Sequence, residues 1–213
     1  MRICFVSHST AKFTAPYVEY FAQNGHEVHL VSLTGKDLPG AINHHPGPPD
    51  FDPAGAAASY FWYATKVRKV VRSIRPDIVH AHYLTSNGMM AAVANVHPLV
   101  VSARGSDVNL TINHPLKRAV LRFVLRRADL VNPVSEDLAD LLAALGPFRE
   151  KMLCLTGGID TGRFIPPPSP SRPRSGPARV ICTRTLAPLY QCDMVVDAVN
   201  LLVTETLRPA VSA

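Results

Sequence analysis

The chain has 213 residues, of which 47% are apolar and 18% charged. This composition supports a hydrophobic core and excludes disorder of the whole chain. A domain usually takes roughly 150 residues, so the length predicts one complete domain and part of a second. Lys and Arg number 22 against 16 Asp and Glu, and this positive balance favours anionic partners such as phosphorylated ligands, acidic lipid surfaces or nucleic acid.

The four cysteines lie far apart and form no CxxC pair. The sequence therefore indicates neither a zinc site nor a small disulfide scaffold. No apolar run approaches the ~18 residues of a membrane span, and the opening MRICFVS lacks the parts of a signal peptide. We expect a cytoplasmic protein.

Short apolar runs alternate with longer stretches of helical period from residue 2 onward. This alternation predicts an α/β fold, a Rossmann-like parallel sheet with helices on both faces. Most of the apolar runs have few polar residues, as strands buried on both faces must. The predicted strands are Arg2 to Ser7, Glu27 to Leu33, Asp77 to His82, Leu99 to Ala103, Leu130 to Val134 and Met152 to Thr156.

Helices are predicted between these strands. The first begins near Thr14, which we expect to cap it, and ends at Gly25. Thr34 to Ala58 is rich in Gly, Pro and His and has no clear period, which predicts a long loop. The later helices are Tyr60 to Ile74, Thr85 to Asn95, Pro115 to Arg127 and Ser135 to Leu145, the last with Ser135 as its N-cap.

Prolines divide the chain. Six of them stand in the segment Ile165 to Pro177, and proline resists both helix and sheet, which makes a semi-rigid spacer. We therefore expect a first domain over residues 1–165, a linker over 166–177, and the truncated start of a second domain over 178–213. In that last part RVICT predicts a strand and CDMVVDAVNLL a helix.

Ligands of an open parallel sheet bind at the carboxyl ends of its strands. After the first strand, SHSTAKF holds neither GxGxxG nor GxxxxGK[ST], which argues against a nicotinamide site and a phosphate-binding P-loop. Ser7 and His8 are candidates to contact a ligand oxygen, and the alternative is that they satisfy the turn. His80 and His82 face the same side of their strand, as a hydrogen-bonded cleft pair, a ligand contact or, least favoured, a metal site.

The segment ARGSDVN follows the fourth predicted strand. Arg104 is a candidate to grip a phosphate or carboxylate, and Asp107 a candidate to accept from sugar hydroxyls. Gly105 lets the backbone approach a ligand closely, and Ser106 lies between these two residues. The alternative is an Arg–Asp ion pair or a loop capped by Asp107.

Two predicted helices carry basic residues at helical spacing. Peripheral contact with the inner face of a membrane is one interpretation, and a solvated face is the other. Nucleic acid is not expected, because no aromatic stacking platform accompanies the charge. The basic residues are Lys66, Lys69 and Arg72 in the first helix and Lys117, Arg118, Arg122 and Arg126 in the second.

The order and spacing of several segments resemble the retaining glycosyltransferase family 4, which has the GT-B fold. This resemblance implies two Rossmann-like domains, the first binding mainly the acceptor and the second the nucleotide-sugar. It also implies transfer with retention of anomeric configuration, with no metal and no cofactor beyond the nucleotide-sugar substrate. The segments are RICFVS, EYFAQNGHEVHLVS, DIVHAHY, PLVVSARGSDV, ADLVNPVSEDL, GGIDTGRFIP and ICTRTLAPLYQCDMVVDA.

The resemblance assigns roles residue by residue. Arg184 matches a family arginine that stabilises charge on the departing diphosphate, whereas the lysine expected six residues later is replaced by Tyr190 and Gln191. The stretch Arg104 to Asp107 matches the family's cleft segment, and Ser135 with Glu136 matches its VSE segment. SHSTAKF replaces the familiar glycine pair, and the Glu-x7-Glu segment is absent from the 213 residues.

The sequence thus predicts a glycosyltransferase that moves a sugar from a nucleotide-sugar to a glycan, lipid-linked or small-molecule acceptor, with incomplete chemistry in this chain alone. One alternative is a non-catalytic subunit or scaffold that pairs with a separate donor-binding chain. Another is a decayed fragment.

Overall fold

The computed structural model describes residues 1–48, 59–166 and 180–206. The chain divides into two units, Met1–Ile159 and Asp160–Ala213, and each is described by itself. Apart from residue 166, the predicted proline-rich linker lies outside the described residues.

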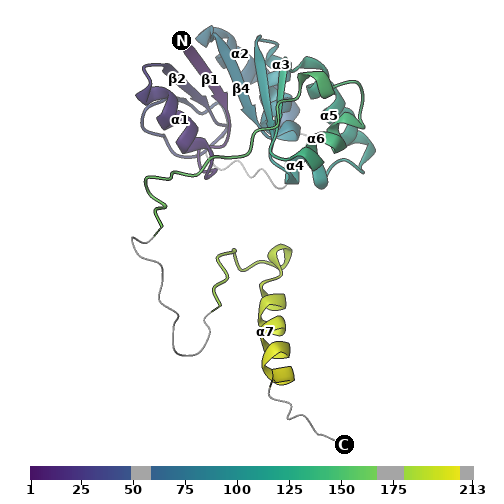
Figure 1. The fold of residues 1–213 in the computed structure, drawn as a ribbon. Helices are drawn as coiled ribbons and strands as arrows, with labels where there is room; N and C mark the ends of the chain where they lie inside the picture. Colours follow the sequence, from purple (N-terminus) through teal and green to yellow (C-terminus); the bar gives the residue numbers. More distant parts are fainter. Residues whose placement is uncertain (49–58, 167–179, 207–213) are drawn as a thin grey trace, which may run out of the picture. The chain divides into compact units, whose positions relative to one another are not determined.

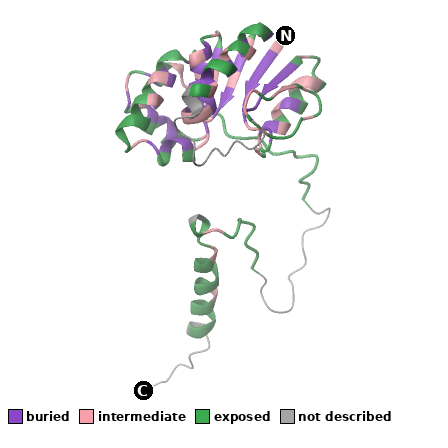
Figure 2. Cartoon of the chain, turned by 180° about the vertical axis from the view of Figure 1, so that it is seen from behind, coloured by how far each residue is buried: buried purple, intermediate pink, exposed green. Residues whose placement is uncertain are grey.

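The first unit is built on a parallel sheet of six strands, counted over the described residues, in the order β3-β2-β1-β4-β5-β6 (Figure 1). The predicted α/β fold is confirmed. Apolar residues fill these strands, and Figure 2 shows most of the sheet buried. The strands are β1 (Arg2–Val6), β2 (Glu27–Val31), β3 (Ile42–His44), β4 (Ile78–His82), β5 (Leu99–Ala103) and β6 (Leu130–Pro133).

Two predictions about strands of the first unit are wrong. The short edge strand β3 lies inside the segment predicted as a loop. It is not predictable from hydrophobic pattern, because three residues are too few to show a period. The strand predicted at Met152 to Thr156 makes only an isolated bridge, between Met152 and Val131. Leu153 donates a backbone hydrogen bond of 2.9 Å to Val131, so this segment follows β6 without becoming a strand.

Helices cover both faces of the sheet. On one face α1 (Thr14–Gln23) packs Val18 against Phe5 and Leu30. On the other face lie α2 (Ser59–Ile74), α3 (Met89–Ala94) and α5 (Pro115–Arg127), which enclose the larger core cluster. Because side chains alternate along a strand, β1 contributes Phe5 to the first cluster and Val6 to the second.

Local sequence explains where several helices begin and end. Gly25 adopts φ +76° just beyond α1, as expected of a glycine that ends a helix. Ser135 caps α6 (Glu136–Ala143) by accepting from the backbone N–H of Leu138 at 3.3 Å, as predicted. Thr14 is not a cap: it is the first helical residue, and its hydroxyl donates to the carbonyl oxygen of His8 instead.

The helix predicted from Thr85 to Asn95 has two parts, a π-helical turn over Leu84–Gly88 followed by α3. The structure adds a one-turn helix, α4 (Ser106–Asn109), immediately after β5. The π-helical turn follows the carboxyl end of β4, and α4 follows the carboxyl end of β5. Both elements therefore shape the surface at this edge of the sheet.

In the second unit, residues 188–190 form a 3-10 turn, which the sequence does not predict, and α7 (Cys192–Thr206) follows. The helix predicted over CDMVVDAVNLL is confirmed and extends to Thr206. The predicted strand RVICT does not form over its described part, residues 180–183, since a strand needs a neighbour and no described residue of this unit supplies one. Many of the unit's apolar side chains are exposed, including Ile181, Leu186, Met194 and Leu202. No helix in the described ranges is long and apolar enough to span a membrane.

Candidate functional site

The carboxyl ends of β1, β4 and β5 meet at one edge of the sheet. Ser7, which directly follows β1, and His82, the last residue of β4, are both fully buried. Their side chains form a hydrogen bond of 3.0 Å between Ser7 Oγ and His82 Nδ1. Arg104 follows β5 and lies over the rings of Phe13 and Tyr17. Both rings also contact His82, with centroids 5.0 Å apart in each case, so the three strand ends share one cluster.

Counting hydrogens assigns the tautomer of His82. Thr14 donates its only hydroxyl hydrogen to the carbonyl oxygen of His8 at 2.8 Å. The 2.8 Å contact between the hydroxyls of Thr14 and Ser7 therefore uses the Ser7 hydrogen. The contact from Ser7 to His82 then needs the hydrogen of the imidazole, so His82 carries its proton on Nδ1 and a lone pair on Nε2.

Burial keeps the two strand histidines neutral. Desolvation, followed by the charges of His80 and Arg104, lowers the pKa of His82 to about 2. Desolvation and Arg104 lower the pKa of His80 to about 4. The two rings lie edge to face with centroids 4.7 Å apart, which confirms that they share one side of the strand. At neutral pH this edge of the sheet therefore carries the Arg104 cation beside two uncharged imidazoles.

Arg104 and His82 hold polar atoms without partners. The guanidinium carbon of Arg104 lies 4.6 Å from the ring centroid of Phe13 and 5.5 Å from that of Tyr17, a cation–π arrangement. Among the described residues, the buried Nε and Nη2 of Arg104 and the Nε2 of His82 have no hydrogen-bond partner. The cluster thus offers two donor nitrogens and one acceptor without partners. A ligand hydroxyl can pair with either kind, and an anionic oxygen can pair with the donors.

Asp107 organises the loop between β5 and α4. Its Oδ1 accepts from the backbone N–H groups of Arg104 and Gly105, both at 3.0 Å, and its Oδ2 accepts from Leu84 at 2.7 Å. Desolvation raises the pKa of Asp107 despite these hydrogen bonds. Of the two alternatives to ligand contact, the capped loop forms rather than an ion pair with Arg104. Asp107 therefore links the segments that follow β4 and β5.

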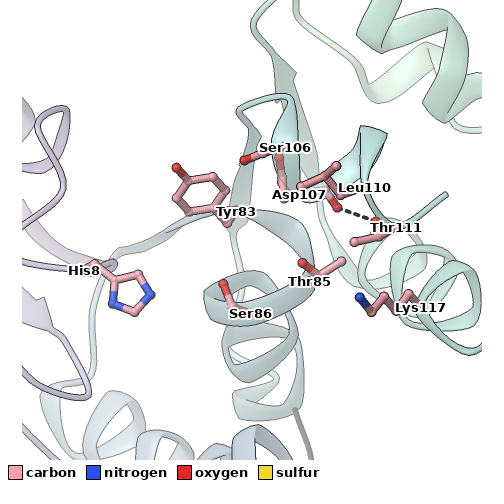
Figure 3. A pocket seen from close by; sticks show the side chains of 9 residues that line it. All are labelled: His8, Tyr83, Thr85, Ser86, Ser106, Asp107, Leu110, Thr111 and Lys117. Carbon is pink, nitrogen blue, oxygen red and sulfur yellow. Dashed lines mark hydrogen bonds between the residues drawn. The ribbon is translucent and has the colours of Figure 1, made fainter. Parts of the chain in front are cut away.

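A pocket of about 320 Å³ lies beside this cluster (Figure 3). Three of the residues proposed from sequence line it, His8, Ser106 and Asp107. Burial lowers the pKa of His8, so this ring faces the pocket as a neutral group. The remaining lining residues are Tyr83, Thr85, Ser86, Leu110, Thr111 and Lys117.

Three residues proposed from sequence belong neither to the strand-end cluster nor to the lining of this pocket. Ser135 is occupied as the cap of α6, and Glu136 pairs with Arg149 at 2.6 Å on the surface. Arg184 belongs to the second unit, where its guanidinium carbon lies 5.6 Å from the ring centroid of Tyr190.

The sequence reasoning missed several residues of the site. Phe13 and Tyr17, which flank Arg104, read as ordinary members of the loop and helix after β1. Tyr83 could be found from the sequence, because it directly follows HAH at the end of a predicted strand. In the structure it adopts φ +71°, which is rare for a residue with a side chain. The sequence indicates Lys117 only as part of a basic helix face. Within the described ranges, no group of three or more His, Cys, Asp or Glu side chains is placed to hold a metal ion.

A model of the family described as glycosyl transferase 4-like matches residues 2–135, more than half of the chain. The chain belongs to this family. The matched region includes the ends of β1, β4 and β5 and therefore the whole cluster around Arg104. None of the curated proteins matches this chain.

Solved structures share the fold at low identity. HepE from Anabaena, in complex with UDP and glucose, is 18% identical with a TM-score of 0.54, over 79% of this chain and 47% of that one. UDP-GlcNAc 2-epimerase from Neisseria meningitidis, bound to UDP-GlcNAc, is 14% identical with a TM-score of 0.51, over 72% and 46%. At such identities the likeness shows the fold alone. The chain spans less than half the length of these structures.

Proposed function

We propose that this chain supplies the acceptor-side domain of a retaining glycosyltransferase, which moves a sugar from a nucleotide-sugar to a glycan, lipid-linked or small-molecule acceptor. The observation that carries the proposal is the unsatisfied Arg104–His82 cluster at the strand ends, inside the region that matches the glycosyl transferase 4-like family. Similar folds that hold UDP with glucose or UDP-GlcNAc support a nucleotide-sugar as the donor.

The chemistry of such a transfer decides which groups it needs. The sugar departs as a positive, oxocarbenium-like centre while negative charge grows on the diphosphate, so a cation must face the leaving group. We assign this role to Arg184, by its match to the family's arginine. Tyr190 and Gln191 stand where the second cation is expected, so one of the two usual charges is replaced.

The acceptor side is assigned to the first unit. Arg104 donates to a ligand oxygen, and the lone pair on His82 Nε2 accepts a hydroxyl hydrogen. Ser106 and His8 contact the ligand from the pocket, and Asp107 and Gly105 shape the loop that holds Arg104. Ser135 and Glu136, although occupied in the cap and the ion pair, border the same end of the sheet at β6.

The basic face of α5 favours an acceptor presented at a membrane surface. Lys117, Arg118, Arg122 and Arg126 are exposed, and Leu116 beside them is 67% exposed. Since Lys117 also lines the pocket, this face and the site are continuous. The basic face of α2 is a weaker candidate for membrane contact, because its Arg72 donates to the carbonyl oxygen of Ala94. Binding to anionic but not to zwitterionic vesicles, lost on reversal of the α5 charges, supports peripheral contact; equal binding to both contradicts it.

A second candidate is a non-catalytic subunit that pairs with a separate donor-binding chain. The exposed apolar side chains of residues 180–206 favour it, because such surfaces mark interaction sites. Recovery of a donor-binding partner with the tagged chain supports this candidate. A strictly monomeric chain that transfers sugar unaided excludes it.

The transfer itself is tested with radiolabelled UDP-glucose, UDP-GlcNAc and GDP-mannose. We expect the purified 213-residue chain to show negligible turnover alone, because the described residues beyond Ile159 form no second sheet for the donor. Added to an extract of the producing cells that lacks only this chain, it should restore incorporation of one label. An extract that incorporates every label equally with and without the chain contradicts the proposal.

A further inference from the structure

Two of the four cysteines meet in the second unit, although ten positions separate them in sequence. Cys182 Sγ lies 3.6 Å from Cys192 Sγ, and the thiol of Cys182 donates to it. The thiol of Cys192 in turn donates to the carbonyl oxygen of Thr185, also at 3.6 Å. The two sulfur atoms are therefore held as neighbours by a short network.

The intervening chain explains why the sulfurs meet. Residues 188–190 form a 3-10 turn, after which Gln191 adopts φ +46° and redirects the backbone into α7. Cys192 is the first residue of that helix. The turn and the left-handed residue thus bring the start of α7 back to Cys182.

The pair differs from Cys4 in accessibility and from Cys154 in its surroundings. Cys182 is exposed and Cys192 partly exposed, whereas Cys4 is buried, and burial raises the pKa of Cys4 to about 12. Cys154 is partly exposed like Cys192, and desolvation together with the nearby Glu136 raises its pKa. The hydrogen bond with Cys182 raises the pKa of Cys192, while Arg184 acts in the opposite direction. Only Cys182 and Cys192 combine access to oxidant with a neighbouring sulfur among the described contacts.

We propose that Cys182 and Cys192 form a reversible disulfide on exposure to a peroxide. The Cys182 sulfur attacks one oxygen of hydrogen peroxide, the O–O bond breaks, and a sulfenic acid and one water result. Cys192 then attacks the sulfenic sulfur, the S–S bond forms, and the hydroxyl leaves with the thiol proton as a second water. Two thiols and one peroxide become one disulfide and two waters, and a dithiol reductant reverses the change.

The disulfide closes a ring around the segment that carries Arg184. Within this segment the Arg184 guanidinium stacks on Tyr190, and the turn at residues 188–190 is the only regular element described. A covalent link across its ends restricts the conformations of this segment. The inference stands on the geometry of the pair and does not depend on the proposed sugar transfer.

Peptide mapping of the full chain tests the pair directly. The reduced protein is treated with limiting hydrogen peroxide, denatured, alkylated and digested with trypsin, which separates residues 180–184 from 185–213. We expect the number of alkylated thiols to fall from the four cysteines of the chain to two. The two peptides should appear as one species, lighter by about 2 Da than their sum and separated by dithiothreitol.

Matched variants identify the sulfurs. Cys182→Ser and Cys192→Ser should each abolish the linked peptide, whereas Cys154→Ser should retain it. Linkage should also be slower in urea, because the folded turn brings the sulfurs together. Oxidation without the 180–184 to 185–213 link, a link only between two copies of the chain, or an equal rate in urea would each overturn the proposal.

Discussion

Acidification should destabilise this protein through His82. The imidazole is fully buried beneath Phe13 and Tyr17, and its pKa in the folded chain is about 2. In the unfolded chain an ordinary histidine has a pKa of about 6.5. Below pH 6.5 the unfolded chain therefore binds the extra proton, so the stability supplied by neutral His82 is complete above that pH and is lost as the pH falls.

The size of the effect follows from the two pKa values. Each pH unit between them changes the free energy of unfolding by about 1.4 kcal/mol, so lowering the pH from about 7.5 to 4.5 removes about 3 kcal/mol through His82. His80, with a pKa of about 4, loses a similar amount over the same interval. Together these losses are a large part of the about 5–15 kcal/mol that stabilises a typical domain.

Urea unfolding followed by circular dichroism at the two pH values measures this loss. The His82→Gln variant lacks the titrating group, so its free energy of unfolding should fall by about 3 kcal/mol less than that of the wild type. The exposed His114 provides the control, and His114→Gln should behave as the wild type does. An equal pH dependence in wild type and His82→Gln would refute the assignment of His82 as a buried neutral base.

Three further substitutions test the loops around the site. Ser135→Ala removes the cap of α6 and should cost about 1 kcal/mol in urea unfolding; a variant as stable as wild type would contradict the cap. Gly105→Ala places a side chain at φ +114° with nothing within 4 Å of its Cβ, and should cost about 1–2 kcal/mol from backbone strain alone, whereas Gly158→Ala, equally open but without that φ, should cost little. Asp107→Ala leaves three backbone N–H groups without their acceptor and should lower the unfolding free energy by about 3 kcal/mol, against a negligible change for the exposed Glu19→Ala.

The parallel sheet was predictable because its strands are apolar on both faces. An apolar run such as Leu99 to Ala103 is enough by itself to predict a buried strand. The predicted helix Pro115 to Arg127 has the same bounds in the structure. The misses have a different origin. β3 is only three residues long and forms because β2 offers it a free edge, and residues 180–183 form no strand because no described neighbour pairs with them.

The candidate site was predictable in its position but not in its contacts. The rule that ligands bind at strand ends selected Ser7, His82 and Arg104, and these residues do lie together. The aromatic rings that flank Arg104 belong to Phe13 and Tyr17, in the loop and helix that follow β1. No local sequence pattern predicts that they pack there. Likewise, the sequence offers a loop capped by Asp107 as one alternative, but it does not show which backbone N–H groups the carboxylate accepts from, those of Leu84, Arg104 and Gly105.

The proposal that the strand-end cluster serves sugar transfer is tested most directly by Arg104→Ala in the restored extract. Loss of a charge-assisted contact of about 3 kcal/mol should lower label incorporation about 100-fold, while Arg122→Ala, an exposed charge of α5, should retain it in an assay free of membranes. Circular dichroism and urea unfolding establish that both variants fold. Undiminished incorporation by folded Arg104→Ala would contradict the account.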